Sequence, residues 1–262
     1  MITRRTLIRG TLAATVLSAA GCSAVAAKRP PEESREDRFG IRKLYGSVQD
    51  GMLWEASWES GRWDDDAWLE RGSDDIRYRI NDGVLTITGA TSRLYVRDPD
   101  KKRQWRNVEV TVYGQRISDD DVPYSGLVTD VRTNHGVTGP LDQNPGDSRG
   151  LVARLRFDGL ADFGKEIRHP RTVATDPIRV FPGEMPKNRW IGYKHICRDL
   201  PDRAGTHQEL WMDLADGKDG GDWRLVASHD DTGHQLGMGE TPPYPDLDPA
   251  MPYLSGEREG SE

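Results

Sequence analysis

Short segments in which apolar and polar residues alternate recur through the middle of the chain. Residues 108–113, for example, place three valines on one face and polar or aromatic residues on the other. Alternation with a period of two predicts half-buried β-strands. The segments with this pattern are 76–80, 84–88, 108–113, 126–133, 151–157, 163–169, 190–197, 208–214 and 223–228. Gly, Asp and Asn separate them, and no window keeps a helical period over three turns.

Many short strands without helices between them predict an all-β fold, an antiparallel sandwich of two sheets. Asn81-Asp82-Gly83 predicts a hairpin turn, because these residues tolerate positive φ. We expect the sandwich to occupy residues 46–235. The polar segment 23–45 is predicted to be a tether, and the proline-rich residues 236–262 are predicted to be a tail without strands.

The first 22 residues have the order of an export signal. Arg4 and Arg5 precede an apolar stretch from 11 to 20, which ends in small residues before Cys22. The stretch is too short to span a bilayer, so it predicts a signal peptide. The paired arginines resemble the twin-arginine signal, and Ala19-Ala20-Gly21-Cys22 resembles a bacterial lipobox, although Ala19 departs from it. We therefore expect lipidation at Cys22; an ordinary cleaved signal and a cytosolic protein remain alternatives.

Composition narrows the classes of partner. The formal net charge is −7, and removal of the signal, which carries three arginines and no acid, would leave −10. Such a chain is a poor candidate for binding nucleic acid, which requires clustered positive charge. Eight Trp, eight Tyr and four Phe can supply a core despite a hydrophobic fraction of 35%. Lipidation of Cys22 would leave Cys197 unpaired, and we expect a monomer that meets the membrane only through its lipid.

Three parts of the predicted strands carry a more specific pattern. Ile80–Gly89 is a turn followed by a strand, Trp105–Tyr113 is a long strand, and Phe163–His169 precedes Arg189–Lys194 by twenty residues. Together they resemble the concanavalin A-like lectin/glucanase superfamily. The resemblance implies a jelly-roll sandwich that binds or cleaves polysaccharide. The three-acid Glu-x-Asp-x-x-Glu pattern of the glucanases is absent, and Glu209 with Asp213 is its nearest approach.

Cations and potential proton-transfer groups lie on several predicted strands. Cleavage of a uronate glycan by β-elimination needs a cation near the carboxylate, a base and an acid. The candidate catalytic residues are His135, Lys165, Glu166, His169 and Lys194, and the candidate substrate-binding residues are Arg132, Arg154, Arg156 and Tyr193. If they converge, they form a groove on a concave sheet. The alternative is that they are solvated strand faces whose long side chains cover aromatic surface.

The predicted function is that of an exported protein, on the outer face of the cell membrane or secreted, that binds polysaccharide or cell-wall glycan. A polysaccharide-degrading enzyme, a lyase or a glycoside hydrolase, is the alternative, so the sequence leaves enzyme and binder open. No cofactor or metal is predicted. Aspartates at 64–66, 119–121 and 216–222 could hold Ca²⁺, but none has the spacing of a complete calcium loop.

Overall fold

A computed structural model describes residues 35–46, 51–62, 66–72, 76–89, 92–100, 102–119, 125–133, 150–168, 171–201, 204–233 and 235–236. The strands are β1 (Leu69–Arg71), β2 (Arg77–Asn81), β3 (Val84–Thr88), β4 (Leu94–Val96), β5 (Val108–Gln115), β6 (Gly126–Val131), β7 (Gly150–Arg156), β8 (Leu160–Arg168), β9 (Arg171–Ala174), β10 (Ile178–Arg179), β11 (Trp190–Asp199), β12 (Thr206–Asp213) and β13 (Arg224–Asp231). One short 3-10 helix, η3, covers Lys218–Gly220. Over these residues no helix is long and apolar enough to cross a bilayer.

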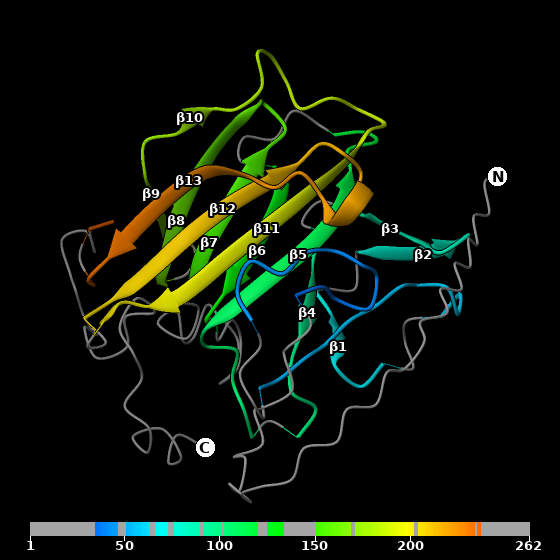
Figure 1. The fold of residues 1–262 in the computed structure, drawn as a ribbon, viewed down its shortest axis with the longest axis horizontal. Coiled ribbons are helices and arrows are strands. Elements are labelled where there is room, and N and C mark those ends of the chain that lie inside the picture. Colours follow the sequence, from blue (N-terminus) through cyan, green and yellow to red (C-terminus); the bar gives the residue numbers. More distant parts are fainter. Residues whose placement is uncertain are drawn as a thin grey trace, which may run out of the picture. The chain divides into compact units, whose positions relative to one another are not determined.

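Two antiparallel sheets are stacked face to face (Figure 1). Sheet I has the strand order β10-β8-β7-β6, and β9 also pairs with β8. Sheet II, in front in Figure 1, has the order β13-β12-β11-β5. The chain enters sheet II with β5, builds sheet I with the next strands, and returns to sheet II with β11. The predicted all-β, antiparallel two-sheet sandwich is confirmed.

Alternation along each strand builds the core between the sheets. Leu155 of β7 and Phe163 of β8 point inward from sheet I and pack in one cluster with Ile191, Tyr193 and Leu210 of sheet II. The intervening residues of each strand point outward, as strand geometry requires. Alternation therefore places the apolar residues of β7, β8 and β11 on the inner faces of the two sheets.

The predicted hairpin forms where the sequence places it. Asp82 and Gly83 have φ values of 50° and 75°, as a two-residue type I′ turn requires, and β2 pairs with β3 in register around them. This hairpin is a separate two-stranded sheet, whereas the family resemblance implies a strand of the sandwich. β1 and β4 form a second small sheet.

Residues 35–46 run along the outer face of sheet II. The amide of Arg42 donates to the carbonyl of Gly220, and the Tyr45 hydroxyl donates to Glu209 Oε1 at 2.7 Å. The described end of the predicted tether therefore contacts the sandwich. Cys22 and residues 237–262 lie outside the described residues, so their predicted roles stay predictions.

Candidate functional site

The structure does not bring the predicted lysines together. Lys165 points inward from β8 of sheet I, where its Nζ lies 2.8 Å from Asp231 Oδ2 and donates to the carbonyl of Gly233. Lys194 points outward from β11 of sheet II, with its Nζ 2.7 Å from Glu109 Oε1 and 4.4 Å from the Trp223 ring centre. Both side chains are buried. Lys165 joins the two sheets, whereas Lys194 lies on the outer face of sheet II, so the two lysines do not share a groove.

Tyr193 and Arg132 also have structural contacts. The Tyr193 hydroxyl donates to the carbonyl of Ala153 at 2.8 Å in the core, and burial raises its pKa. Arg132, at the end of β6, has its Nη2 atom 2.7 Å from Asp199 Oδ1, at the end of β11. This ion pair joins the two sheets. His135 and His169 lie outside the described residues, so their predicted roles are untested.

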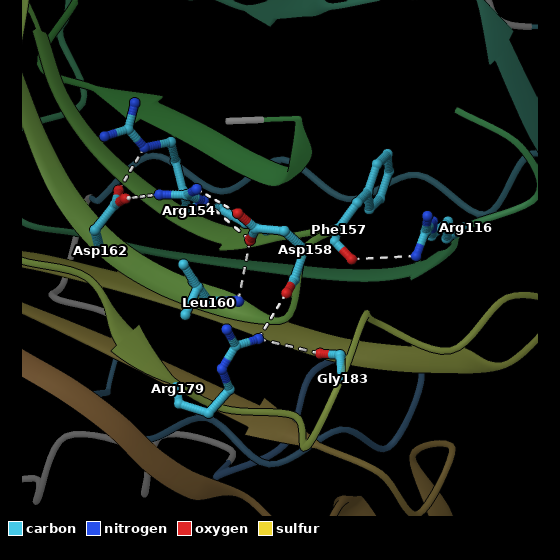
Figure 2. A network of polar contacts seen from close by, with 9 residues as sticks. Arg116, Arg154, Phe157, Asp158, Leu160, Asp162, Arg179 and Gly183 are labelled. Atoms are coloured by element: carbon cyan, nitrogen blue, oxygen red, sulfur yellow. Dashed lines mark hydrogen bonds and ion pairs between the residues drawn. The ribbon is translucent and has the colours of Figure 1, made fainter. Parts of the chain in front are cut away.

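Arg154 and Arg156 lie on the outer face of sheet I and converge on Asp162 (Figure 2). Asp162 is 2% exposed and accepts hydrogen bonds from both arginines. Arg156 also pairs with Asp158, whose carbonyl accepts a hydrogen bond from Arg179 at 2.8 Å. The two arginines predicted to bind substrate thus fix the turn from β7 to β8.

Acidic side chains of β12 in sheet II also form hydrogen bonds within the protein. Glu209 accepts hydrogen bonds from Tyr45 and Trp211 at 2.7 Å and contacts His207 Nε2 at 3.0 Å. Burial acts to raise the pKa of Glu209, but these hydrogen bonds lower it below its usual value. Asp213 accepts the amides of Ala215, Gly217 and Asp222. Glu209 and Asp213, the acids nearest to the glucanase pattern, therefore have structural roles. Glu209 holds the N-terminal segment, and Asp213 holds the turn between β12 and β13.

A different pair of carboxylates meets on the outer face of sheet I. Asp130 of β6 folds over Gly150 at the start of β7: a methyl group added to Gly150 would lie 1.9 Å from Asp130 Oδ1. Glu166 of β8 is the direct cross-strand partner of Gly150 on its other side. Directly paired positions have Cβ atoms about 5 Å apart. The two carboxylates therefore share the space above a glycine that leaves room for them.

Environment separates these two acids. Asp130 keeps contact with solvent, whereas Glu166 is 9% exposed. Surrounding protein atoms and then the charge of Glu166 raise the pKa of Asp130 well above its usual range, while Thr133 and Arg93 oppose the shift. The like charge of Glu166 acts in the same direction as burial. Two acids with different environments are typical of acid–base sites.

Tyr95 of β4 completes this cluster. Arg93 and Arg97 lie over its ring, at 5.9 Å and 4.9 Å from the ring centre. Burial raises the pKa of the Tyr95 hydroxyl, the two arginines lower it, and the charges of Asp130 and Glu166 raise it further. We call Tyr95, Asp130, Gly150 and Glu166, with the flanking arginines, the Asp130 site.

Only part of this site can be predicted from the sequence. Glu166 is among the residues predicted from the sequence, whereas Asp130 is not, and Tyr95 lies in a strand too short to predict. The register that sets Gly150 between the two acids depends on three strands distant in sequence. A glycine at the first position of an alternating strand was the one available signal.

No group of three or more metal-ligating side chains is present among the residues that the structure describes. Of the aspartates considered for Ca²⁺, Asp222 pairs with Arg224 at 2.7 Å, and residues 64, 65, 120 and 121 lie outside the described ranges.

The fold and the site thus define an all-β sandwich with a pair of coupled carboxylates on the outer face of one sheet. No protein-family model matches this chain, and neither a curated protein nor a solved structure matches it either.

Proposed function

We propose that this protein binds a polysaccharide beside Asp130, which is the exposed member of the carboxylate pair, and hydrolyses it at the Asp130 site. The observation that carries the proposal is the meeting of Asp130 and Glu166 above Gly150, with the pKa of Asp130 raised. Glycoside hydrolysis needs two carboxyl groups about 5–10 Å apart, one of them protonated. Asp130 and Glu166 stand on strands two spacings, or about 10 Å, apart and share the space between them.

Each acid has a defined part in this reaction. Asp130, whose pKa is raised by its surroundings, donates a proton to the glycosidic oxygen as the bond from that oxygen to the anomeric carbon breaks. A water molecule attacks the anomeric carbon, and Glu166 accepts a proton from that water. Tyr95 is placed to hydrogen-bond a sugar hydroxyl. The products are a new reducing end and a free alcohol, and the proton on Glu166 returns to Asp130 through solvent.

A second candidate is β-elimination from a uronate glycan, which Tyr95 and its two arginines favour. Arg93 or Arg97 would neutralise the uronate carboxylate, Glu166 would take the C5 proton, and Tyr95 would protonate the leaving oxygen. The raised pKa of Tyr95 suits donation of a proton better than abstraction. The new non-reducing end would carry an unsaturated uronate, whereas hydrolysis would leave a saturated sugar with a free hydroxyl.

The test is a panel of soluble neutral and uronate polysaccharides, assayed for new reducing ends and for absorbance by unsaturated uronate. Reducing ends without that absorbance support hydrolysis, and both signals together support elimination. Asp130→Asn and Glu166→Gln should each lower the rate by about 10²-fold or more. Asp100→Asn, at a carboxylate 69% exposed and paired with Lys102, is the matched control. Binding without turnover by the unchanged protein would overturn the catalytic part of the proposal.

We also propose that the protein acts outside the cytoplasm, anchored through lipid on Cys22. The order of Arg4-Arg5, the apolar stretch and Ala19-Ala20-Gly21-Cys22 supports this location. A glycan of the cell wall or surroundings would then be within reach of the sandwich.

A further inference from the structure

A pocket of about 300 Å³ lies outside the Asp130 site, between the N-terminal segment and the turn that follows Ser57. Trp58 lines one wall, and Arg38, Glu55, Arg62 and Asp66 contribute to the others. This size is at the lower end of the range of ligand pockets, which runs from about 300 to 1,000 Å³. The pocket therefore has room for a small group such as one sugar ring.

The backbone of Trp58 is held in the left-handed region, with φ at 55°. This conformation is common for Gly and Asn and rare for a bulky residue. The Trp58 carbonyl accepts the amide of Gly61 at 3.2 Å, so the conformation belongs to a defined turn. Glycine or asparagine would make the same turn with less strain, so the conformation points to a role for the indole side chain.

The neighbouring residues fix the indole on the pocket wall. The Trp54 and Trp58 rings lie 6.3 Å apart, and Trp54 Nε1 donates to Asp66 Oδ2 at 2.8 Å. Arg38 Nη2 donates to the Glu55 carbonyl at 3.0 Å on the other side. These contacts position Trp58, which is half-buried and so keeps part of its surface accessible.

The chemistry around Trp58 combines one aromatic surface with donors and acceptors at its edge. A pyranose ring has C–H groups on its faces and hydroxyls around its rim, so it can stack on an indole while its hydroxyls reach arginine and carboxylate groups. The two arginines and two carboxylates on the walls balance in charge. An anionic sugar would gain no net attraction there, whereas a neutral sugar would have partners for its hydroxyls.

We infer that this pocket binds one neutral pyranose unit of a glycan, with Trp58 as the stacking surface. The inference rests on the proposed function only in taking a glycan as the ligand, since it uses none of the residues of the Asp130 site. It adds a second point of attachment, which would hold a polymer to the protein independently of cleavage.

Isothermal titration calorimetry of the full chain with cello-, xylo-, manno- and malto-oligosaccharides tests the inference. Trp58→Asn should raise the Kd by about tenfold or more for the oligosaccharide that binds. The same variant should fold at least as well as the unchanged protein, because asparagine tolerates the left-handed conformation, and thermal unfolding checks this. Trp58→Phe should keep most of the affinity, since it keeps a ring.

The outcomes separate this inference from the proposed function. If Trp58→Asn lowers the affinity and Asp130→Asn does not change turnover, the sugar-binding role of the pocket is supported and the catalytic proposal is wrong. If Asp130→Asn abolishes turnover and Trp58→Asn binds every oligosaccharide as the unchanged protein does, the pocket inference is wrong. Absence of binding by the unchanged protein to all four series would also overturn it.

Discussion

Acidification should destabilise this protein through one buried histidine, His195 of β11. Its imidazole is fully buried between the sheets, with Nδ1 2.8 Å from Thr129 Oγ1 and Nε2 3.1 Å from Gln208 Oε1. Burial lowers the pKa of His195 from 6.5 to about 4. The native protein therefore keeps His195 neutral at a pH where the unfolded chain protonates it.

The size of the effect follows from the two pKa values. Between pH 6.5 and about 4 the unfolded state binds a proton that the native state does not, so stability falls as the pH falls. The separation of about 2.5 pH units corresponds to about 3 kcal/mol, lost in full below pH 4. Between about pH 7 and pH 5 the loss due to His195 should be about 2 kcal/mol.

The hydrogen bonds of His195 also predict its tautomer. With the Gln208 amide placed as above, its Nε2 atom is buried without a partner. Turning the amide over lets that nitrogen donate to His195 Nε2, so that Nδ1–H donates to Thr129 and the Thr129 hydroxyl donates to Tyr193 at 2.6 Å. Every donor in this chain then has an acceptor, because Tyr193 donates to Ala153. We expect the neutral Nδ1–H tautomer.

Urea unfolding of the unchanged protein and of His195→Gln, at about pH 7 and about pH 5, measures the effect. The variant will be less stable at both values, but its loss between them should be smaller by about 2 kcal/mol. Nitrogen chemical shifts of the His195 ring report its tautomer and pKa directly. Equal losses in the two proteins, or titration of His195 near 6.5, would refute the reasoning.

Three further predictions concern charge, packing and location. Lys165→Met should destabilise the fold by about 3–5 kcal/mol, since it leaves the Asp231 carboxylate buried without its cation. Adding Asp231→Asn should recover part of this loss in urea unfolding, and an equally unstable double variant would contradict the prediction. Gly150→Ala should abolish any turnover and shift the Asp130 carbon signal in NMR, because the added methyl would occupy the place of its carboxylate; unchanged turnover would remove Gly150 from the site. Cys22→Ala should release the protein from the membrane fraction, and a variant that stays bound would show that lipid on Cys22 is not the anchor.

Alternation of residue types was sufficient to predict the sandwich and the faces of its main strands. Gly150–Arg156, for example, has inward Leu151, Ala153 and Leu155, and the structure buries all three. The four strands that the pattern missed are β1, β4, β9 and β10, which are two to four residues long. A period of two cannot be recognised over so few positions. β9 and β10 pair with the longer β8, whereas β1 and β4 pair with each other.

Alternation could not predict which sheet each strand joins. Lys165 and Lys194 were grouped because a resembled family has such residues in the same order, yet β8 and β11 belong to opposite sheets and the two side chains point in different directions. Alternation tells which side chains of one strand share a face, but it does not tell which sheet the strand joins. The partner of each ion is set by register between strands distant in sequence, as Glu109 and Lys194 show.

The same limit explains why cations were a misleading guide to the site. In a chain with 43 acidic and 36 basic residues, an arginine or lysine on a strand can readily reach a carboxylate. Arg132, Arg154, Lys165 and Lys194 each have such a partner, and pairing lets a charged group be buried at modest cost. Opposite charges in contact therefore carry little information about function here. Asp130 and Glu166 differ from these pairs, because they are like charges that the register of β6, β7 and β8 sets on either side of Gly150, and for this reason the proposed function rests on them.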